Sequence, residues 1–372
     1  MGVYITVIAR SSEDREGRIE SLDVLRGFTI AGMIVVDDPG TWSAVYPPLL
    51  HAEWNGWTYT DTIFPFFLFL AGASLVLSLS RRAAAGGPRG VLLRGLARRA
   101  GALFALGLAL NLVSYLALGL DRFRIPGVLQ RIGVCVFVAG AVWLLGGARA
   151  AALAGAVASA LLLGYWALMR GGVDPSDNLA ARVDRAVLGT HTWKPGFDPE
   201  GILSTIPAIA TTLLGVLAGA RLTGPAPRAR KIRDLWIGGA AAVAAGLLWG
   251  RSFPVNKNLW TSSYALLTAG LAAAALAACL ALEPWSLWRR ATAPLRWLGR
   301  NAIAAFTLSM LGAIGLLAVR VNGRSLWRTI HVAVFDRFAD PRLGSLLFAL
   351  AYLAVWIAVC GALYRKRIFL KI

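Results

Sequence analysis

Residues 61–80 read DTIFPFFLFLAGASLVLSLS, a run of apolar side chains that begins with one carboxylate, Asp61. A helix of about 20 apolar residues is long enough to cross the hydrocarbon core of a bilayer. Further runs of this kind lie along the chain at 21–36, 94–118, 125–147, 150–169, 203–221, 233–250, 259–281, 300–320 and 343–364. The sequence therefore predicts an all-α, polytopic transmembrane helix bundle of about ten spans.

The composition agrees with a membrane protein and excludes other classes. The 372 residues are 57% hydrophobic and 15% charged, with a mean hydropathy of +0.63. Soluble chains have about 45–50% apolar and about 25% charged residues. The three cysteines lie inside apolar runs without a CxxC spacing, which excludes a disulfide scaffold and a cysteine metal site. We expect one membrane domain over 21–372, after a short cytoplasmic segment over 1–20.

The basic residues predict the orientation. The net charge is +19. With the N-terminus inside, the inner segments carry more Lys and Arg than the outer loops, as the positive-inside rule requires. Both termini are therefore expected in the cytoplasm. No basic stripe interleaves with aromatic residues on a soluble module, so the expected partner is membrane lipid and not nucleic acid.

Two segments fit neither spans nor plain loops. Pro284–Arg300 combines three Trp with four Arg and is typical of a helix in the cytoplasmic interface. Ser325–Phe338 is too short to span and is expected on the outer surface or as a re-entrant segment. His331, within it, is expected to be solvated or interfacial.

The outer ends of the spans hold the unusual polar residues. Carboxylates, amides and indoles together suit a sugar, because hydroxyl groups need paired donors and acceptors and a pyranose face stacks on an indole. The alternative is that these residues only cap helices and anchor the bundle in the interface. The candidate sugar-binding residues are Asp37, Asp38, Trp54, Arg124, Gln130, Asp198, Glu200, Lys257 and Asn258.

His51 is the candidate general base. It lies among carboxylates and aromatic residues between the first two spans. An imidazole titrates near neutral pH, so it can take a proton from an amine or a hydroxyl nucleophile. Asp61 is placed to orient it by holding one ring nitrogen protonated. In the first span, Asp23 and Arg26 are three residues apart and are expected to pair with each other.

Several stretches resemble the heparan-α-glucosaminide N-acetyltransferase family of transmembrane acyltransferases. SLDVLRG at 21–27 and LHAEWNGWT at 50–58, followed by Asp61 and FPFF at 64–67, carry the resemblance. Similar stretches are 124–131, 197–204, 254–260 and 299–302. The likeness extends over residues 20–365, and its most specific part is the His-Ala-x-Trp-Asn-Gly stretch with the Asp that follows.

The resemblance implies transfer of an acetyl group from cytoplasmic acetyl-CoA, a co-substrate, to the amine of a terminal glucosamine on the far side. The family's active-site histidine falls on His51, and the amide of its Trp-Asn-Gly falls on Asn55. Animal members have a luminal N-terminal region, whereas this chain has about 20 residues before its first span. Where members often have Asn, this chain has Asp37-Asp38-Pro39-Gly40. The first departure favours a bacterial inner-membrane enzyme, and the extra carboxylate of the second is expected to change the acceptor preference.

The sequence thus predicts an integral-membrane acetyltransferase without a metal. His51 deprotonates the acceptor amine or carries the acetyl group itself, and direct transfer is favoured because an outward-opening pocket is hard to keep dry. Asn55 is the candidate donor to the tetrahedral oxyanion. Arg300 and Asn301 are candidate CoA-binding residues, although the sequence does not choose among the arginines near the inner face, which are Arg81, Arg82, Arg98, Arg99 and Arg300.

Two other functions stay open. An amino-sugar secondary transporter would also need outward polar helix ends, but it usually has paired broken helices in related halves, and the sequence has no matching pair. A membrane scaffold or receptor leaves His51 and its carboxylates unexplained. The identity of the acceptor sugar also stays open, and a homodimer is compatible with the sequence.

Overall fold

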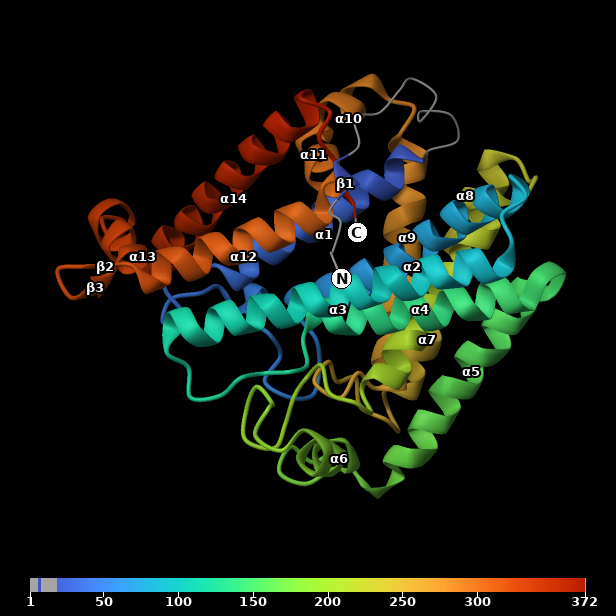
Figure 1. Cartoon of the computed structure of the whole chain (residues 1–372), viewed down its shortest axis with the longest axis horizontal. Helices are drawn as coiled ribbons and strands as arrows, with labels where there is room; N and C mark the ends of the chain where they lie inside the picture. The colour runs from blue at the N-terminus through green and yellow to red at the C-terminus, as the bar shows by residue number, and fades with distance from the viewer. Residues whose placement is uncertain (1–5, 8–18, 372) are drawn as a thin grey trace.

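The structure is an assembly of long helices joined by loops (Figure 1). It is a computed structural model and describes residues 6–7 and 19–371. Each predicted apolar run coincides with one long helix, with boundaries that differ by up to five residues. The long helices are α1 (Glu20–Asp37), α2 (Thr60–Ala84), α3 (Arg89–Leu118), α4 (Val128–Gly146), α5 (Ala150–Leu168), α7 (Thr205–Thr223), α8 (Arg228–Trp249), α9 (Ser262–Leu282), α12 (Ala302–Ala318) and α14 (Pro341–Arg365).

The shorter elements connect and cover these helices. They are α6 (Leu179–Leu188), α10 (Ser286–Ala291), α11 (Ala293–Arg300), α13 (Leu326–Ile330), the 3₁₀ turns Pro47–Leu49, Gly147–Arg149 and Met169–Gly171, a π-helical turn over His331–Phe335, and the strands β1 (Thr6–Val7), β2 (Arg320–Val321), β3 (Arg324–Ser325) and β4 (Leu370–Lys371). β1 pairs with β4 and β2 pairs with β3, both antiparallel. The prediction of an all-α fold is confirmed.

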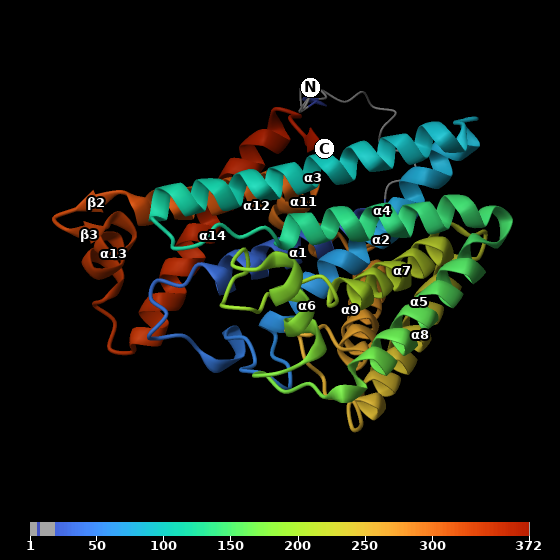
Figure 2. The same cartoon turned by 60° about the horizontal axis from the view of Figure 1, so that its bottom comes forward.

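Seven helical stretches of the described chain are long and apolar enough to cross a membrane. One of them, Val128–Gly171, contains both α4 and α5 in 44 residues. A straight helix of that length would extend about 66 Å, roughly twice the hydrocarbon thickness. The chain instead turns at Gly147, where φ is 52°, and α5 runs back from the end of α4 (Figures 1 and 2). The chain therefore has the helices of a multi-pass membrane protein, and the count of ten spans stays a prediction.

The central helices pack with their backbones close together. A Cβ atom on Gly72 of α2 would lie 2.0 Å from the carbonyl oxygen of Thr212 in α7, and one on Gly215 would lie 2.0 Å from that of Phe69. Small residues allow this approach in membrane helices, where packing contacts drive association. α2 and α7 therefore form a fixed pair against which α4 and α9 pack.

A bend of 86° separates α11 from α12. The helix predicted over Pro284–Arg300 is two helices, α10 and α11, and α11 packs against α1. Their location in the interface stays a prediction. The contact is close, since a Cβ atom on Gly27 of α1 would lie 1.8 Å from the carbonyl oxygen of Leu295. The sequence showed the arginines and tryptophans of the segment, but it did not predict that the segment packs against Gly27.

Within the segment Ser325–Phe338, one residue is less exposed than predicted. His331 was expected to be solvated or interfacial, but it is only 2% exposed. Its ring lies 5.8 Å from that of Phe348 in α14 and directly against Gly40, which has no side chain to obstruct it. The expectation was wrong because Gly40, which makes room for the ring, comes from a distant part of the chain.

The loops that carry most candidate site residues gather on one side of the bundle (Figures 1 and 2). Backbone and side-chain hydrogen bonds join them. The Gly56 N–H donates to the Val255 carbonyl at 2.8 Å, and the Trp54 indole donates to the Val173 carbonyl at 2.8 Å. These bonds connect the loop before α2 with those before α9 and α6.

Candidate active site

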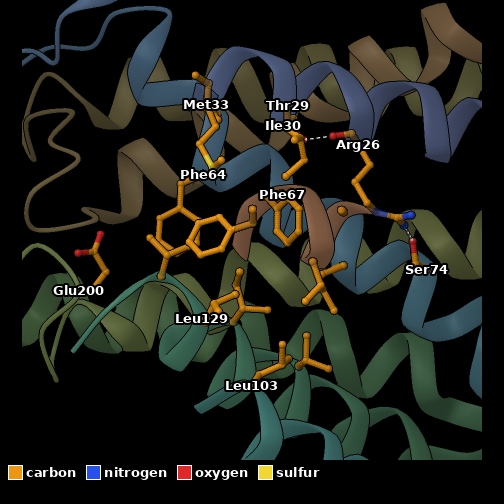
Figure 3. Close-up of a pocket in the computed structure, with 18 of the residues that line it drawn as sticks. Arg26, Thr29, Ile30, Met33, Phe64, Phe67, Ser74, Leu103, Leu129 and Glu200 are labelled. Atoms are coloured by element: carbon orange, nitrogen blue, oxygen red, sulfur yellow. Dashed lines mark hydrogen bonds between the residues drawn. The ribbon is translucent and has the colours of Figure 1, made fainter. Parts of the chain in front are cut away.

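One large cavity of about 2350 Å³ extends between α1, α2, α3, α4 and α12. Its middle is apolar and includes Met33, Phe67 and Leu129. Figure 3 shows these side chains between Glu200 on one side and Arg26 on the other. Polar groups thus lie at the two ends of the cavity, and the middle between them is lined by apolar side chains.

The length of α2 gives the distance between the two ends of the cavity. Asp61 lies in its first turn and Arg81 in its last. Twenty residues of helix rise about 30 Å, which is also the thickness of the hydrocarbon core. The end near Asp61 and the end near Arg81 are therefore about one membrane thickness apart.

At the first end, Asp61 positions His51. One carboxylate oxygen of Asp61 lies 2.7 Å from His51 Nδ1. The other accepts hydrogen bonds from the backbone N–H groups of Ala52 at 3.0 Å and Thr58 at 2.9 Å. The Asp61 side chain is 1% exposed and that of His51 is 46% exposed. A buried, fixed carboxylate thus holds an imidazole that faces the cavity.

This arrangement determines which ring nitrogen is basic. Ionised Asp61 can only accept hydrogen bonds, so His51 Nδ1 carries the proton and donates it. Nε2 then keeps its lone pair. The local geometry is that of an oriented general base.

Lys257 lies directly beside this base. Its Nζ is 3.0 Å from His51 Nε2 and 3.1 Å from Nδ1. The two distances are nearly equal, so Nζ lies over the face of the imidazole and contacts both ring nitrogens. Burial lowers the pKa of Lys257, and the nearby carboxylates of Glu200 and Asp61 only partly oppose this shift.

Arg124 joins the loops on the other side of this end. Its guanidinium donates to both carboxylate oxygens of Asp198, at 2.8 and 2.6 Å, and also to Glu200. Burial works against the charge on Arg124, but the two carboxylates outweigh it and raise the pKa of Arg124. Burial also opposes ionisation of Glu200, but the neighbouring cations, Arg124 first among them, lower the pKa of Glu200. The group therefore stays charged and fixes the cavity wall.

The second end of the cavity is lined by arginines from three helices and the α11–α12 bend. Arg26 donates to Ser74 at 2.5 Å and to Asp23 at 3.1 Å, so the predicted Asp23–Arg26 pair is present. Arg300 lies over the rings of Tyr364 and Phe369, at 4.9 and 4.4 Å from their centroids. The arginines that line this end are Arg26, Arg81, Arg82, Arg98, Arg99 and Arg300.

Comparison with known proteins identifies the family. The family model described as "Heparan-alpha-glucosaminide N-acetyltransferase, catalytic" matches residues 18–252, more than half of the chain. The chain belongs to this acyltransferase family. Two relatives named heparan-alpha-glucosaminide N-acetyltransferase, from Homo sapiens and Mus musculus, are 28% and 26% identical over 95% of this chain. The chain spans about 60% of the length of these relatives.

Most sugar-binding residues predicted for this family member line the cavity. Trp54 stands there with its ring 5.7 Å from that of Phe197. Every arginine considered for CoA lines the opposite end. The predicted residues that line the cavity are Asp37, His51, Trp54, Arg124, Glu200, Lys257, Asn258 and Arg300.

The other predicted residues are not part of the described lining. Asn55 is exposed and accepts a hydrogen bond from the Asn256 amide at 3.1 Å. Gln130 donates to the Ile125 carbonyl at 2.9 Å, and Asn301 accepts from the Leu370 N–H at 3.3 Å. Asp38 and Asp198 are likewise absent from the described lining, and Asp198 acts through Arg124. Asp61 is also absent from the described lining, and it belongs to the site through its hydrogen bond with His51.

Some lining residues were not predicted. Trp193 stands beside Arg124, whose guanidinium is 5.3 Å from the centre of the indole. Lys194 also lines this end. Trp193 and Lys194 come from the long loop between α6 and α7, where nothing in the sequence distinguishes them from solvated residues.

The described residues contain no group of three or more His, Cys, Asp or Glu side chains that could hold a metal ion. Cys135, Cys279 and Cys360 are buried and unpaired.

Proposed function

We propose that this chain is an integral-membrane acetyltransferase of a bacterial inner membrane. It moves acetyl from cytoplasmic acetyl-CoA to the amine of a glucosamine-type sugar on the extracytoplasmic side. The observation that carries this proposal is the single cavity with arginines at one end and the His51–Asp61 pair at the other. Family membership and the names of the relatives support the same reaction.

The proposed topology has ten spans with both termini inside. It counts α4 and α5 separately, takes the bent α11–α12 pair as one span, and adds α1, which carries four charged residues in its 18. The pairing of β1 with β4 supports an even number, because it holds residues near both chain ends together. The Lys and Arg distribution supports the inside location of these ends.

The arginine end suits the donor. CoA carries several phosphates, and guanidinium groups bind phosphate oxygens in pairs of parallel hydrogen bonds. Acetyl-CoA is too polar to cross a bilayer, so its phosphates stay on the cytoplasmic side. Its uncharged arm then extends through the apolar middle past Phe67 and Leu129 toward His51.

In the proposed reaction, His51 Nε2 takes a proton from the acceptor amine as its nitrogen attacks the thioester carbonyl. Asp61 stabilises the imidazolium that forms, and His51 returns the proton to the departing thiolate. Asp37 and Glu200 face the cavity and attract the acceptor as an ammonium ion, which loses one proton to water before the neutral amine attacks. Direct transfer with both substrates bound is the proposed order.

The alternative of an amino-sugar transporter has less support. Paired broken helices in related halves are typical of that class. The described helices include one bent pair, α11 with α12, without a counterpart.

The test uses purified protein in detergent with acetyl-CoA and either glucosamine or glucose. We expect CoA release and N-acetylglucosamine with glucosamine, and neither with glucose, because glucose lacks the amine. Equal rates with glucose would contradict the amine acceptor and indicate O-acetylation. Uptake of glucosamine into proteoliposomes without acetylation would identify the transporter instead.

A further inference from the structure

The side chain of Lys257 places a primary amine beside the base His51. Its Nζ lies 3.0 Å from His51 Nε2. In the proposed reaction, that ring nitrogen takes the proton from the acceptor amine. A primary amine is thus already present where the proposed acceptor must bind.

The backbone holds Lys257 in this position. The neighbouring Asn256 is fully buried. Its amide donates to Asn55 at 3.1 Å, its side-chain oxygen accepts from the Leu259 N–H at 2.9 Å, and its backbone N–H donates to Thr261 at 3.0 Å. The side chain of Lys257 therefore extends from a fixed turn, and its approach to His51 is not the chance position of a loose surface residue.

The surroundings also favour the reactive form of the amine. Glu200, Asp37 and Asp61 supply negative charge, but burial dominates and lowers the pKa of Lys257. A lowered pKa increases the fraction of neutral amine, which is the nucleophile in acyl transfer. Lys194 lines the same end of the cavity but is exposed and has no bond to His51 among the described interactions.

We propose that Lys257 is a self-acetylation site, modified by bound acetyl-CoA when no sugar acceptor is present. The proposal rests on the proposed acetyltransferase function. The neutral Nζ attacks the thioester carbonyl, a C–N bond forms and the C–S bond breaks. His51 Nε2 takes the proton from nitrogen and gives it to the thiolate, so the products are acetyl-lysine and CoA.

This modification would inactivate the site. An acetamide at Lys257 adds bulk beside His51, removes a positive charge, and fills the place of the acceptor amine. Acceptor and lysine therefore compete for the same acetyl group. Saturating glucosamine should protect the enzyme.

The experiment incubates the purified full-length protein with acetyl-CoA alone and maps adducts by peptide mass spectrometry. We expect one acetyl group on Lys257 that resists hydroxylamine, no acetyl group on Lys194, and less modification when glucosamine is present. Glucosamine turnover after the incubation should fall in proportion to the fraction of Lys257 acetylated. His51→Ala should prevent the adduct.

Two variants control for folding. Lys257→Arg keeps the charge but cannot form this adduct, so its activity, whatever its starting value, should no longer decline during incubation with acetyl-CoA. Lys194→Arg should decline like the wild type. Equal decline in Lys257→Arg and the wild type would contradict the proposal.

The outcomes separate this proposal from the proposed function. Glucosamine turnover with unmodified Lys257 would overturn self-acetylation and leave the acetyltransferase intact. A hydroxylamine-labile adduct on His51 alone would also overturn it and would support an acetyl-histidine intermediate. Neither turnover nor any adduct would overturn both.

Discussion

His51 is the residue on which the proposed chemistry depends most directly. Its Nδ1 is 2.7 Å from the buried carboxylate of Asp61, which leaves Nε2 as the base. We expect His51→Ala to lower glucosamine acetylation by about 10²–10⁴-fold, the usual contribution of a general base. CoA binding, measured by calorimetry, should persist because the arginines lie at the other end of the cavity.

His191 provides the matched control. It is exposed, its Nδ1 lies 2.8 Å from the Phe123 carbonyl oxygen, and it is not part of the described cavity lining. His191→Ala should therefore keep near-normal turnover. Normal turnover in His51→Ala would remove the imidazole from the mechanism.

At this scale, the sequence predicted relations that are local and missed those that are not. His51 and Asp61 flank the start of the same helix, so their pairing followed from a short spacing. Asn55 was expected to support the oxyanion, but its position depends on Asn256, a residue 201 positions away. No pattern near Asn55 indicates that contact. The catalytic roles themselves stay predictions.

At the scale of elements, Arg124 ties the loop before α4 to the loop before α7. The Asp198 side chain is fully buried and that of Glu200 is 8% exposed. Arg124→Gln leaves both carboxylates without their cation. Breaking a buried ion pair on one side costs about 3–5 kcal/mol. We therefore expect a clearly lower thermal unfolding midpoint in detergent, with weaker acceptor binding.

An exposed ion pair shows what the effect of a surface charge should be. Arg182 lies 3.5 Å from Asp177, and both side chains are more than half exposed. Such pairs contribute about 0–1 kcal/mol. Arg182→Gln should barely move the midpoint. Similar midpoints for the two variants would contradict the structural role assigned to Arg124.

The contact between α1 and α11 gives a second prediction for elements. A Cβ atom on Gly27 would lie 1.8 Å from the Leu295 carbonyl oxygen, so Gly27→Ala must separate the two helices. Overpacking of this kind costs about 1–3 kcal/mol. A Cβ atom on Gly101 of α3 would meet no neighbouring atom within 4 Å, so Gly101→Ala should be neutral or mildly stabilising. Detergent melting curves distinguish the two, and equal curves would contradict the close packing.

The long helices were predictable because a spanning helix needs only length and apolar composition, both of which are local. The bend between α11 and α12 and the burial of His331 were not. Each depends on a partner that lies far away in the sequence, such as Gly27 for α11 and Gly40 for His331.

For the whole molecule, the cavity was the feature that the sequence could not supply. In the sequence, Arg81, Arg98 and Arg300 are generic basic residues near inner helix ends. They become one site because the last turn of α2, the first half of α3 and the α11–α12 bend meet at one end of the bundle. The way these three elements pack together cannot be predicted from residue spacing along the chain.

The proposed topology predicts which positions are accessible from outside the cell. If the arginine end is cytoplasmic and the His51 end is outside, single cysteines at the exposed positions 51, 53 and 194 should react with an impermeant maleimide in intact cells. Cysteines at 82 and 230, which are also exposed, should react only after the membrane is opened. The native cysteines are all buried, so background labelling should be low. Because α2 joins position 61 to position 82 through one membrane thickness, these two regions cannot share a side. Labelling of position 230 in intact cells would therefore reverse the whole arrangement, and it would place the arginines on the side where acetyl-CoA is absent.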